Sequence, residues 1–472
     1  MSKILMVSSE AAPFAKTGGL ADVVGALPAA LREFGHHTRV LIPRYQVTRK
    51  LPAHRIWDSL PIRLGNSYFD TSIYAADADP NFLMLDCPQL YDRPGLYFDA
   101  AGDYPDNPLR FGLLCRAAVE VARKIFRPDI FHCHDWQSGL VPVYLKTQLA
   151  NDPTFFGCKT LCTIHNLGYQ GWFHPGVLAS LGLPAWLYRT DLLEFYGTVN
   201  FLKAGLVFSD WLSTVSVRYA LEIQTPEFGF GLDGLLRARS SALSGILNGV
   251  DYTTWNPATD PLIPANYSEN DLSGKRQCKA ALLDEFHLPE RAMTRPLIGL
   301  VSRFTSQKGA DLIAEAASAL FKEDLYFVAL GSGEPRYEAM FRHLAEVNPG
   351  RVGIQFGYNE ALAHRIEAGA DIFLMPSQYE PCGLNQIYSL KYGTVPVVRA
   401  TGGLDDTIES DTGFKFREYS GRAMLASVRE CLQAYAEPPR WRRLVRNGMC
   451  KDFSWRQSAR QYSDLYERIL NL

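Results

Sequence analysis

The stretch that decides the fold is KILMVSSEAAPFAKTGGLADVVGALPAALREFG, residues 3–35. It begins with KILMVSS, an apolar run of the kind that forms a buried parallel strand. From Gly19 onward, apolar residues recur at intervals of three and four, which predicts a helix that Gly35 can end. A strand followed at once by an amphipathic helix is typical of a parallel sheet covered by helices.

The same alternation continues along the chain. Further strands are expected at HTRVLIP, DIFHCHD, CKTLCTIHN and WLSTVS in the first half, and at PLIGLVSRF, LYFVALGSG, RVGIQFGY, DIFLMPSQ and VPVVRATGG in the second. Helices are expected at GADLIAEAASALFKE, ALAHRIEAGA and LNQIYSLKYG. The pattern predicts an α/β protein with doubly wound parallel sheets.

The chain of 472 residues is too long for one ordinary core, so two domains are expected. Gly, Asn and Pro gather near residues 240–260, which places a boundary there. We expect an N-terminal domain at 1–245 and a C-terminal domain at 246–455. The remaining segment, 456–472, is an amphipathic helix expected to pack back on the N-terminal domain.

Composition excludes several classes of protein. The formal net charge is −2, so no overall field attracts nucleic acid or a membrane surface. No run approaches the roughly 20 apolar residues of a membrane span. None of the nine cysteines forms a C-x-x-C pair, so reduced, mostly buried thiols in a cytoplasmic protein are expected. The sequence does not indicate an oligomeric state.

Polar residues at strand ends are the first candidates for a site, because open parallel sheets bind ligands there. Lys16, Gly18 and Gly19 stand where the first strand meets the first helix, and a helix N-terminus attracts anions. The hexapeptide TGGLAD at 17–22 recurs as TGGLDD at 401–406, with five of six positions identical. We interpret both copies as turns for a phosphate or carboxylate, although turn geometry alone would also account for either copy.

Two further stretches follow strands, and a third lies on a strand. Arg303 and Lys308 suit a diphosphate, because they combine a fork of donors with a compact charge. Glu380 suits the hydroxyls of a sugar, and a catalytic thiol at Cys382 has no histidine close in sequence. The pattern FHCHD at 131–135 could form a metal site, but two histidines and an aspartate are a weak signal.

Other nucleotide motifs are missing. GSGEP at 331–335 is not G-x-G-x-x-G, because residue 336 is Arg, and there is no G-x-x-x-x-G-K-[ST]. A dinucleotide oxidoreductase and a P-loop kinase are therefore disfavoured.

Together these stretches resemble the glycogen and plant-type starch synthase family, which uses nucleotide-activated glucose. The resemblance rests on motifs that run in the family's order, namely KTGGLADVVGALPAAL, HDW, TIHNLGYQG, GLDGLL, NGVD, SRFTSQKG, EPCGLNQIYSLKYG and TGGLDDTI. It implies a GT-B fold, with two Rossmann-like domains facing a central cleft. It also implies retaining transfer of glucose from ADP-glucose to the non-reducing end of an α-1,4-glucan, without a metal or other cofactor.

The matching motifs imply roles for single residues. The implied catalytic set consists of Lys16, His165, Arg303, Lys308 and Glu380. Lys16 would lie near the donor phosphates, Arg303 and Lys308 would hold the diphosphate, and Glu380 and His165 would lie at the sugar. The implied substrate-binding residues are Lys16, Gly18, Gly19, Asp22, Asp135, Asn248, Tyr358, Cys382, Gly383, Thr401, Gly402 and Gly403.

The chain departs from the family pattern at three positions. Gln137 replaces a common histidine, His37 replaces an acidic residue, and Asn385 replaces the usual threonine. Asn385 is the closest of the three to the donor motifs. Two alternatives stay open: the same reaction with UDP-glucose, and a nucleotide-sugar or glucan binding protein without turnover.

Overall fold

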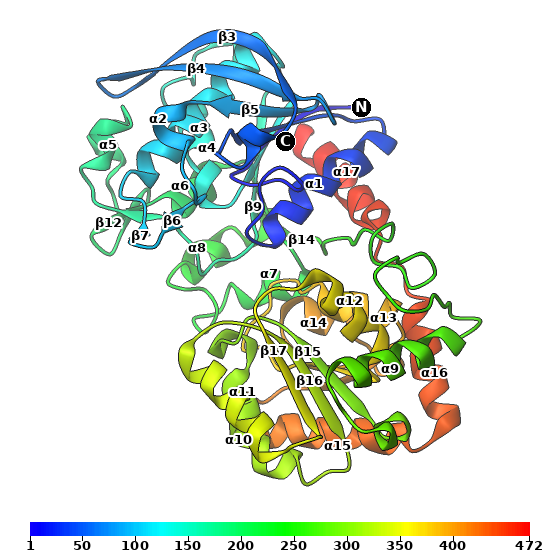
Figure 1. The fold of residues 1–472 in the computed structure, drawn as a ribbon. Helices are drawn as coiled ribbons and strands as arrows, with labels where there is room; N and C mark the ends of the chain where they lie inside the picture. Colours follow the sequence, from blue (N-terminus) through cyan, green and yellow to red (C-terminus); the bar gives the residue numbers. More distant parts are fainter. The chain divides into compact units, whose positions relative to one another are not determined.

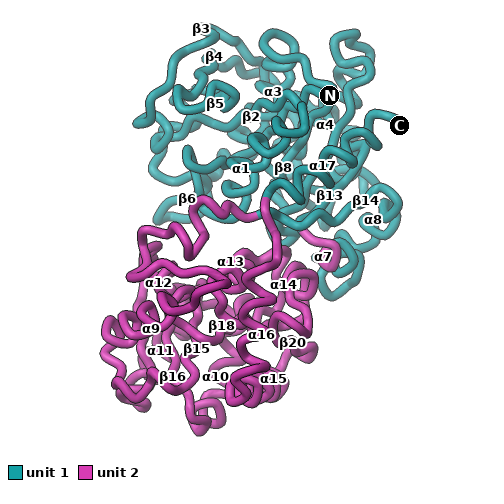
Figure 2. The backbone as a smooth tube through the Cα atoms, turned by 90° about the vertical axis from the view of Figure 1, so that its right-hand side faces the viewer, with its two compact units in different colours: residues 1–215, 220–249, 455–472 teal, residues 216–219, 250–454 magenta.

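The computed structural model describes residues 1–472, which divide into two compact units (Figures 1 and 2). The first unit comprises residues 1–215, 220–249 and 455–472, and the second comprises 216–219 and 250–454. The chain therefore passes between the units near residues 249 and 454, a few residues from the expected boundaries. The short excursion of 216–219 into the second unit is a feature that the sequence did not indicate.

The first unit is built on one nine-stranded sheet. Its strands, in spatial order, are β14 (Leu243–Gly245), β13 (Trp211–Thr214), β9 (Lys159–Ile164), β8 (Ile130–His134), β1 (Lys3–Val7), β2 (His37–Pro43), β5 (Phe82–Asp86), β4 (Ser67–Ala76) and β3 (Ala53–Leu64). From β14 to β5 neighbouring strands pair in parallel, as the alternation predicts. The edge formed by β3 and β4 is antiparallel and was not predicted.

Helices cover both faces of this sheet. The helices of this unit are α1 (Gly19–Glu33), α2 (Pro88–Tyr91), α3 (Asn107–Lys124), α4 (Leu140–Lys146), α5 (Val177–Ser180), α6 (Phe201–Phe208), α8 (Asp233–Ala238) and α17 (Trp455–Leu470), with α7 (Val217–Glu222) at the passage between the units. Alternate residues of β1 enter two cores. Leu5 and Val7 pack in the core that includes α3, α4 and α6, whereas Ile4 and Met6 pack in the core that includes α1 and α17.

The C-terminal helix α17 lies beside α1 in the first unit (Figure 1). Its buried stripe includes Ala459, Tyr462, Tyr466 and Ile469. The Tyr466 hydroxyl also lies 2.8 Å from Nδ1 of His132 on β8. A segment about 330 residues away in the sequence is therefore part of the first unit's core.

The second unit has a six-stranded parallel sheet. Its spatial order is β17 (Val352–Phe356), β16 (Tyr326–Gly331), β15 (Leu297–Val301), β18 (Ile372–Met375), β19 (Val395–Arg399) and β20 (Phe414–Phe416). Its helices are α9 (Ser273–Glu285), α10 (Ala310–Leu320), α11 (Pro335–Val347), α12 (Glu360–Gly369), α13 (Asn385–Lys391), α14 (Gly402–Thr407), α15 (Gly421–Tyr435) and α16 (Pro438–Met449). Phe327 packs with α10 and α15, and Val328 packs with α9 and α12, so this sheet is also covered on both faces.

Two smaller sheets complete the first unit. One has three strands in the order β10 (Trp172–Phe173), β12 (Thr198–Asn200) and β11 (Glu194–Phe195), and the other pairs β6 (Phe98–Asp99) with β7 (Gly102–Asp103). None of the helices is both long and apolar enough to span a membrane.

Candidate active site

In the first unit, candidate residues gather where β1, β8 and β9 end. These strands pair in parallel, so their carboxyl ends meet at one edge of the sheet. Glu10 comes shortly after β1, Asp135 directly follows β8, and His165 directly follows β9. This is the edge at which open parallel sheets bind ligands.

Glu10 holds the loop between β1 and α1. Its buried carboxylate accepts a hydrogen bond from Thr17 Oγ1 at 2.6 Å and others from the backbone N–H groups of Thr17 and Gly18. The Tyr97 hydroxyl donates to the same carboxylate. Burial, with the charge of Glu10 in second place, raises the pKa of Tyr97 well above its usual value, so this hydroxyl remains a donor. Glu10 therefore positions the loop that carries Lys16.

The glycine pair Gly18–Gly19 borders open space. Gly18 is the N-cap of α1, with an extended φ of −158°. A Cβ atom built on Gly18 or Gly19 would meet no atom within 4 Å. The first N–H groups of a helix lack acceptors within the helix. The N-terminus of α1 is therefore accessible to an anionic group.

Lys16 and Asp22 form an ion pair on this loop. The distance from Lys16 Nζ to Asp22 Oδ1 is 2.6 Å, and both side chains are partly exposed to solvent. An exposed pair of this kind contributes little to stability, so Lys16 can exchange Asp22 for another anion at low cost.

Asp135 is held in an unusual backbone conformation. Its φ of 54° with ψ of −168° lies in a region that is almost restricted to glycine, and strain of this kind is common at functional sites. The side chain is buried, and Oδ1 accepts a hydrogen bond from the backbone N–H of His165 at 2.7 Å. Burial raises the pKa of Asp135 to about 7, although backbone N–H donors oppose the shift. Asp135 thus fixes the start of the segment after β9.

The histidines of this edge are buried and neutral. His134 Nδ1 lies 3.0 Å from His165 Nε2, so one ring donates and the other accepts. Burial lowers the pKa of His165 to about 3 and that of His134 well below its usual value. His132 is hydrogen-bonded to Tyr466 and to Thr163 Oγ1. No group of three or more His, Cys, Asp or Glu side chains is placed to hold a metal ion.

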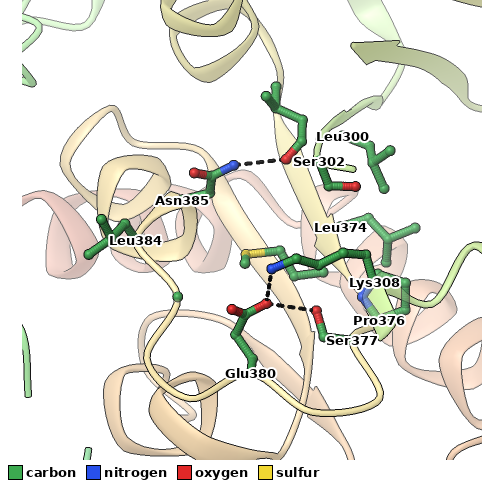
Figure 3. Close-up of a pocket in the computed structure, with 12 residues that line it drawn as sticks. Leu300, Ser302, Lys308, Leu374, Pro376, Ser377, Glu380, Leu384 and Asn385 are labelled. Atoms are coloured by element: carbon green, nitrogen blue, oxygen red, sulfur yellow. Dashed lines mark hydrogen bonds and ion pairs between the residues drawn. The ribbon is translucent and has the colours of Figure 1, made fainter. Parts of the chain in front are cut away.

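In the second unit, a cavity of about 140 Å³ lies at the carboxyl ends of β15 and β18 (Figure 3). Lys308 Nζ lies 2.5 Å from Glu380 Oε2, and Ser377 Oγ donates to the same oxygen at 3.1 Å. Figure 3 shows Lys308 and Ser377 both directed at one oxygen of the Glu380 carboxylate. Asn385 Nδ2 donates to the carbonyl of Val301 at 2.8 Å, so this departure from the family pattern lines the same cavity.

The loop that carries Arg303 and Lys308 is shaped by Gly309. Gly309 has a φ of 78°, and a Cβ atom there would lie 2.2 Å from the carbonyl oxygen of Pro376. Only glycine lets this loop pack so closely against the chain after β18. Arg303 is exposed and donates to Gln307 Oε1 at 3.2 Å. Its guanidinium is therefore held outside the cavity lining, in contact with solvent.

The segments 380–383 and 401–403 are packed together. The N–H of Gly403 donates to the carbonyl of Glu380 at 3.1 Å. A Cβ atom on Gly402 would lie 1.9 Å from the Glu380 carbonyl oxygen, and one on Gly403 would lie 2.0 Å from that of Cys382. Thr401 is buried, and Gly383 has a φ of 71°. The second TGGL turn therefore supports the loop of Glu380, whereas the first turn faces open space.

Two other candidates lie apart from these clusters within their own units. Asn248, in the first unit, is buried, and its Oδ1 has no hydrogen-bond partner. Tyr358, in the second unit, follows β17 and is 87% exposed. Neither residue lies in the cavity beside Glu380.

Sequence reasoning missed Glu10 and Ser377. Glu10 follows the strand KILMV, and Ser377 follows the strand IFLM. The rule that ligands bind at the carboxyl ends of strands could have indicated both positions. Ser377 contacts Glu380 only three residues away, and Glu10 contacts Thr17 seven residues away. The contact of Glu10 with Tyr97, 87 residues away, was not visible from local pattern.

Two family models match the chain. The starch synthase catalytic domain matches residues 3–238, and glycosyl transferases group 1 matches residues 285–448. A curated glycogen synthase from Koribacter versatilis is 51% identical over 98% of both chains. Another from Myxococcus xanthus is 48% identical over 99% of both chains.

Solved structures give the same result. The chain is similar to the catalytic domain of Starch Synthase IV from Arabidopsis thaliana, bound to ADP and acarbose, with a TM-score of 0.90 and 32% identity over 100% of both chains. A sucrose-phosphate synthase from Thermosynechococcus elongatus, with a TM-score of 0.61 and 18% identity over 100% of both chains, shares the fold. These likenesses confirm the predicted GT-B type of α/β fold with two parallel-sheet domains. The chain belongs to the glycogen and starch synthase family of glycosyltransferases.

Proposed function

We propose that this protein is a glycogen synthase that transfers glucose from ADP-glucose to the non-reducing end of an α-1,4-glucan and releases ADP. The observation that carries the proposal is the contact of Lys308 with Glu380 at the cavity of the second unit's sheet, in a chain of this family. A nucleotide sugar has a diphosphate, which a cation can bind, and sugar hydroxyls, which a carboxylate can bind. Lys308 and Glu380 place both kinds of group at one edge of the sheet.

The cations would act on the leaving group. Negative charge grows on the diphosphate as the glycosidic bond breaks, and preorganised donors aimed at that charge lower the barrier. Lys308 uses one of its three N–H donors on Glu380, and Arg303 is exposed to solvent, so both can donate to a diphosphate. Within the first unit, Lys16 and the N-terminus of α1 would bind an anionic group in the same way.

Glu380 would act on the sugar. An ionised carboxylate accepts hydrogen bonds and donates none, so its partners in a donor complex are hydroxyls rather than phosphates. Ser377 and Lys308 fix one of its oxygens and thereby orient the group. In the first unit, His165 is neutral at pH 7 and can bind a hydroxyl group without adding charge.

We propose that the configuration at the anomeric carbon is retained by same-face attack. A double displacement needs a carboxylate that is free to act as a nucleophile. The carboxylates at these strand ends are already engaged, Glu10 by the 17–18 loop, Asp135 by His165 and Glu380 by Lys308. These contacts support attack by the acceptor hydroxyl on the face that ADP leaves.

We propose that side-chain cations serve in place of a metal ion. Lys16, Arg303 and Lys308 provide positive charge of the kind that a divalent metal supplies in other phosphoryl and glycosyl transfers. A chelator added to the assay is expected to leave the rate unchanged. A rate that falls with EDTA and recovers with Mg²⁺ would contradict this part of the proposal.

The test of the function is release of nucleoside diphosphate. The protein is incubated with glycogen and either ADP-glucose or UDP-glucose, with Glu380→Gln as a variant of almost the same shape. We expect ADP release with a clear preference for ADP-glucose, and a kcat about 10²- to 10³-fold lower in the variant. The ADP in the Arabidopsis structure supports this choice of donor.

Other outcomes would change the assignment. If the protein released UDP from UDP-glucose faster than ADP from ADP-glucose, the donor would be UDP-glucose instead. Binding of either nucleotide sugar without release of a diphosphate would indicate a binding protein, and no release or binding would overturn the proposal.

A further inference from the structure

Four aromatic side chains form a cluster in the first unit, away from the residues assigned above. Trp172 lies on β10, Phe195 and Tyr196 lie at the end of β11, and Phe230 lies in the loop before α8. Tyr196 is 82% exposed, Trp172 57% and Phe230 39%, whereas Phe195 is buried beneath them. We call these four residues the aromatic platform.

Contacts between the rings make the aromatic platform continuous. The ring centroid of Phe195 lies 5.9 Å from that of Trp172 and 4.7 Å from that of Tyr196. A Cβ atom on Gly231, next to Phe230, would lie 2.9 Å from Phe195 Cζ and 3.3 Å from Tyr196 Cε2. The 230–231 loop therefore packs directly on the same rings.

Gln170 holds the platform from below. This buried residue accepts a hydrogen bond from Trp172 Nε1 at 3.0 Å and donates to the carbonyl of Phe230 at 3.2 Å. Asn200 Nδ2 donates to the same Gln170 oxygen at 2.6 Å. Because the single N–H of the indole is satisfied inside the protein, the exposed part of Trp172 is apolar ring surface.

The backbone at Tyr196 is adapted to display the ring. Tyr196 and Gly197 join β11 to β12, and both have positive φ values, 47° and 84°. A two-residue hairpin with this pattern favours Asn-Gly, and a bulky residue in the first position is strained. Phe230 repeats the pattern with a φ of 46° before Gly231. Strain retained at two exposed aromatic residues indicates a role other than stability.

The charges near the platform select the kind of ligand. Arg189 is paired with Asp191 at 2.7 Å. Lys203 Nζ donates to the carbonyls of Thr190 and Glu194, and so points into the unit. A surface that binds single-stranded nucleic acid by stacking also needs cations for the phosphates. Aromatic rings whose neighbouring cations are engaged suit a neutral ligand.

We propose that the aromatic platform binds the α-1,4-glucan acceptor, as a glucan subsite of the first unit. The C–H face of a pyranose ring is apolar and can stack on an aromatic face, while its hydroxyls stay in water. The loop 165–171 carries both His165 and Gln170, so the platform and the candidate active site share one support. The identity of the polymer rests on the proposed function, whereas the geometry of the platform does not.

The test compares long and short acceptors in Trp172→Ala and Tyr196→Asn. Maltoheptaose binding is measured by calorimetry, and ADP release from ADP-glucose is measured with glycogen and with maltose. We expect Kd for maltoheptaose and KM for glycogen to rise about tenfold, and kcat and KM for maltose to stay within about twofold. The matched control is Tyr68→Ala, which removes a tyrosine that is 71% exposed on β4. This control should leave Kd for maltoheptaose and KM for glycogen unchanged.

Tyr196→Asn separates binding from folding. Asn suits the turn better than Tyr, so the melting temperature should stay equal or rise while glucan affinity falls. If Tyr196 had only a structural role, Tyr196→Asn would lower the melting temperature and leave the affinity for maltoheptaose unchanged.

Several outcomes would overturn the proposal. The first is that the wild-type protein does not bind maltoheptaose. The second is that both platform variants keep the wild-type Kd for maltoheptaose and KM for glycogen. The third is that the variants change oligomeric state in sedimentation without a change in glucan affinity. If the wild-type protein released no diphosphate from any donor, the proposed function would fail. A loss of maltoheptaose binding in the two variants alone would still support the platform.

Discussion

The two TGGL turns have almost the same sequence but different physical roles. TGGLAD at 17–22 begins α1 and TGGLDD at 401–406 begins α14, and each follows a parallel strand. In the first turn, Gly18 and Gly19 leave open space in which a Cβ atom would meet nothing within 4 Å. In the second turn, the same space is filled by the segment 380–382.

Their hydrogen bonds differ in the same way. In the first turn, the N–H groups of Thr17 and Gly18 donate to the carboxylate of Glu10. The space beside Gly18 and Gly19 remains open to a ligand. The N–H of Gly403 in the second turn is used by the carbonyl of Glu380. One short motif thus serves as an accessible surface in the first unit and as a packing support in the second.

Gly402→Ala should have the largest effect. A Cβ atom 1.9 Å from the Glu380 carbonyl forces the two segments apart. We expect the free energy of unfolding to fall by about 2–4 kcal/mol, together with a large loss of activity. Gly18→Ala, at an extended φ and in open space, should change stability by less than about 0.5 kcal/mol. Urea denaturation of both variants checks this, and equal losses would remove the distinction between the turns.

Lys308→Ala should have the next largest effect, because it leaves the buried carboxylate of Glu380 without its cation. We expect a loss of about 1–3 kcal/mol in stability. The kcat for ADP release should fall about 10²- to 10³-fold. The control is Lys451→Ala, whose 2.7 Å pair with Glu409 is on the surface. A variant at Lys308 that behaved like the control would contradict the assignment.

Lower pH should destabilise the first unit. Burial lowers the pKa of His132 and His165 to about 3, so below pH 6.5 the unfolded chain binds protons that the fold excludes. The contribution of these two histidines to stability is therefore complete above pH 6.5 and falls on acidification, by about 2 kcal/mol per pH unit between pH 6 and 5.

Asp135 changes the stability in the opposite direction as the pH falls. Its pKa is raised to about 7, so between about pH 4 and 7 the native state binds a proton that the unfolded chain releases. Asp135→Asn should therefore make the acid loss steeper. Melting temperatures from pH 7 to 5 measure both effects, and a flat profile in both proteins would contradict the buried, neutral histidines.

Lys16→Ala should have the smallest effect on stability. Its pair with Asp22 is exposed to solvent, so the change should be below about 0.5 kcal/mol. Activity should nevertheless fall roughly 10²-fold if the first turn is a binding surface. Lys146→Ala removes another 2.6 Å pair of the same unit and should retain full activity. Full activity in Lys16→Ala would show that the first turn is not part of the site.

Most of the fold was predictable because its signals are local. Continuous apolar runs predicted the parallel strands, and a stripe of Ala459, Tyr462 and Tyr466 predicted the face of α17 that is buried. The hairpin of β3 and β4 was missed, because the first half of β3 is largely exposed and has no continuous apolar run. Helix α11 was also missed, although Tyr337, Phe341 and Leu344 recur at helical spacing on its buried side.

The candidate site was predictable only in part. Strand ends and residue type are enough to select Lys16, Lys308 and Glu380. Local pattern does not say that Glu380 contacts Lys308 at 2.5 Å, since 72 residues separate them. The pairing of Asp135 with the N–H of His165 likewise depends on the register of two neighbouring strands.

The sequence by itself determined the alternation of parallel strands with helices, the two-domain organisation and the kinds of side chain that stand at the strand ends. These depend on periodicity and on residue chemistry, which are properties of short stretches. Only the tertiary structure decided which TGGL turn is open and which is filled. That difference depends on atoms about 20 residues away in sequence, where the 380–382 segment packs against Gly402 and Gly403, and nothing comparable covers Gly18 and Gly19.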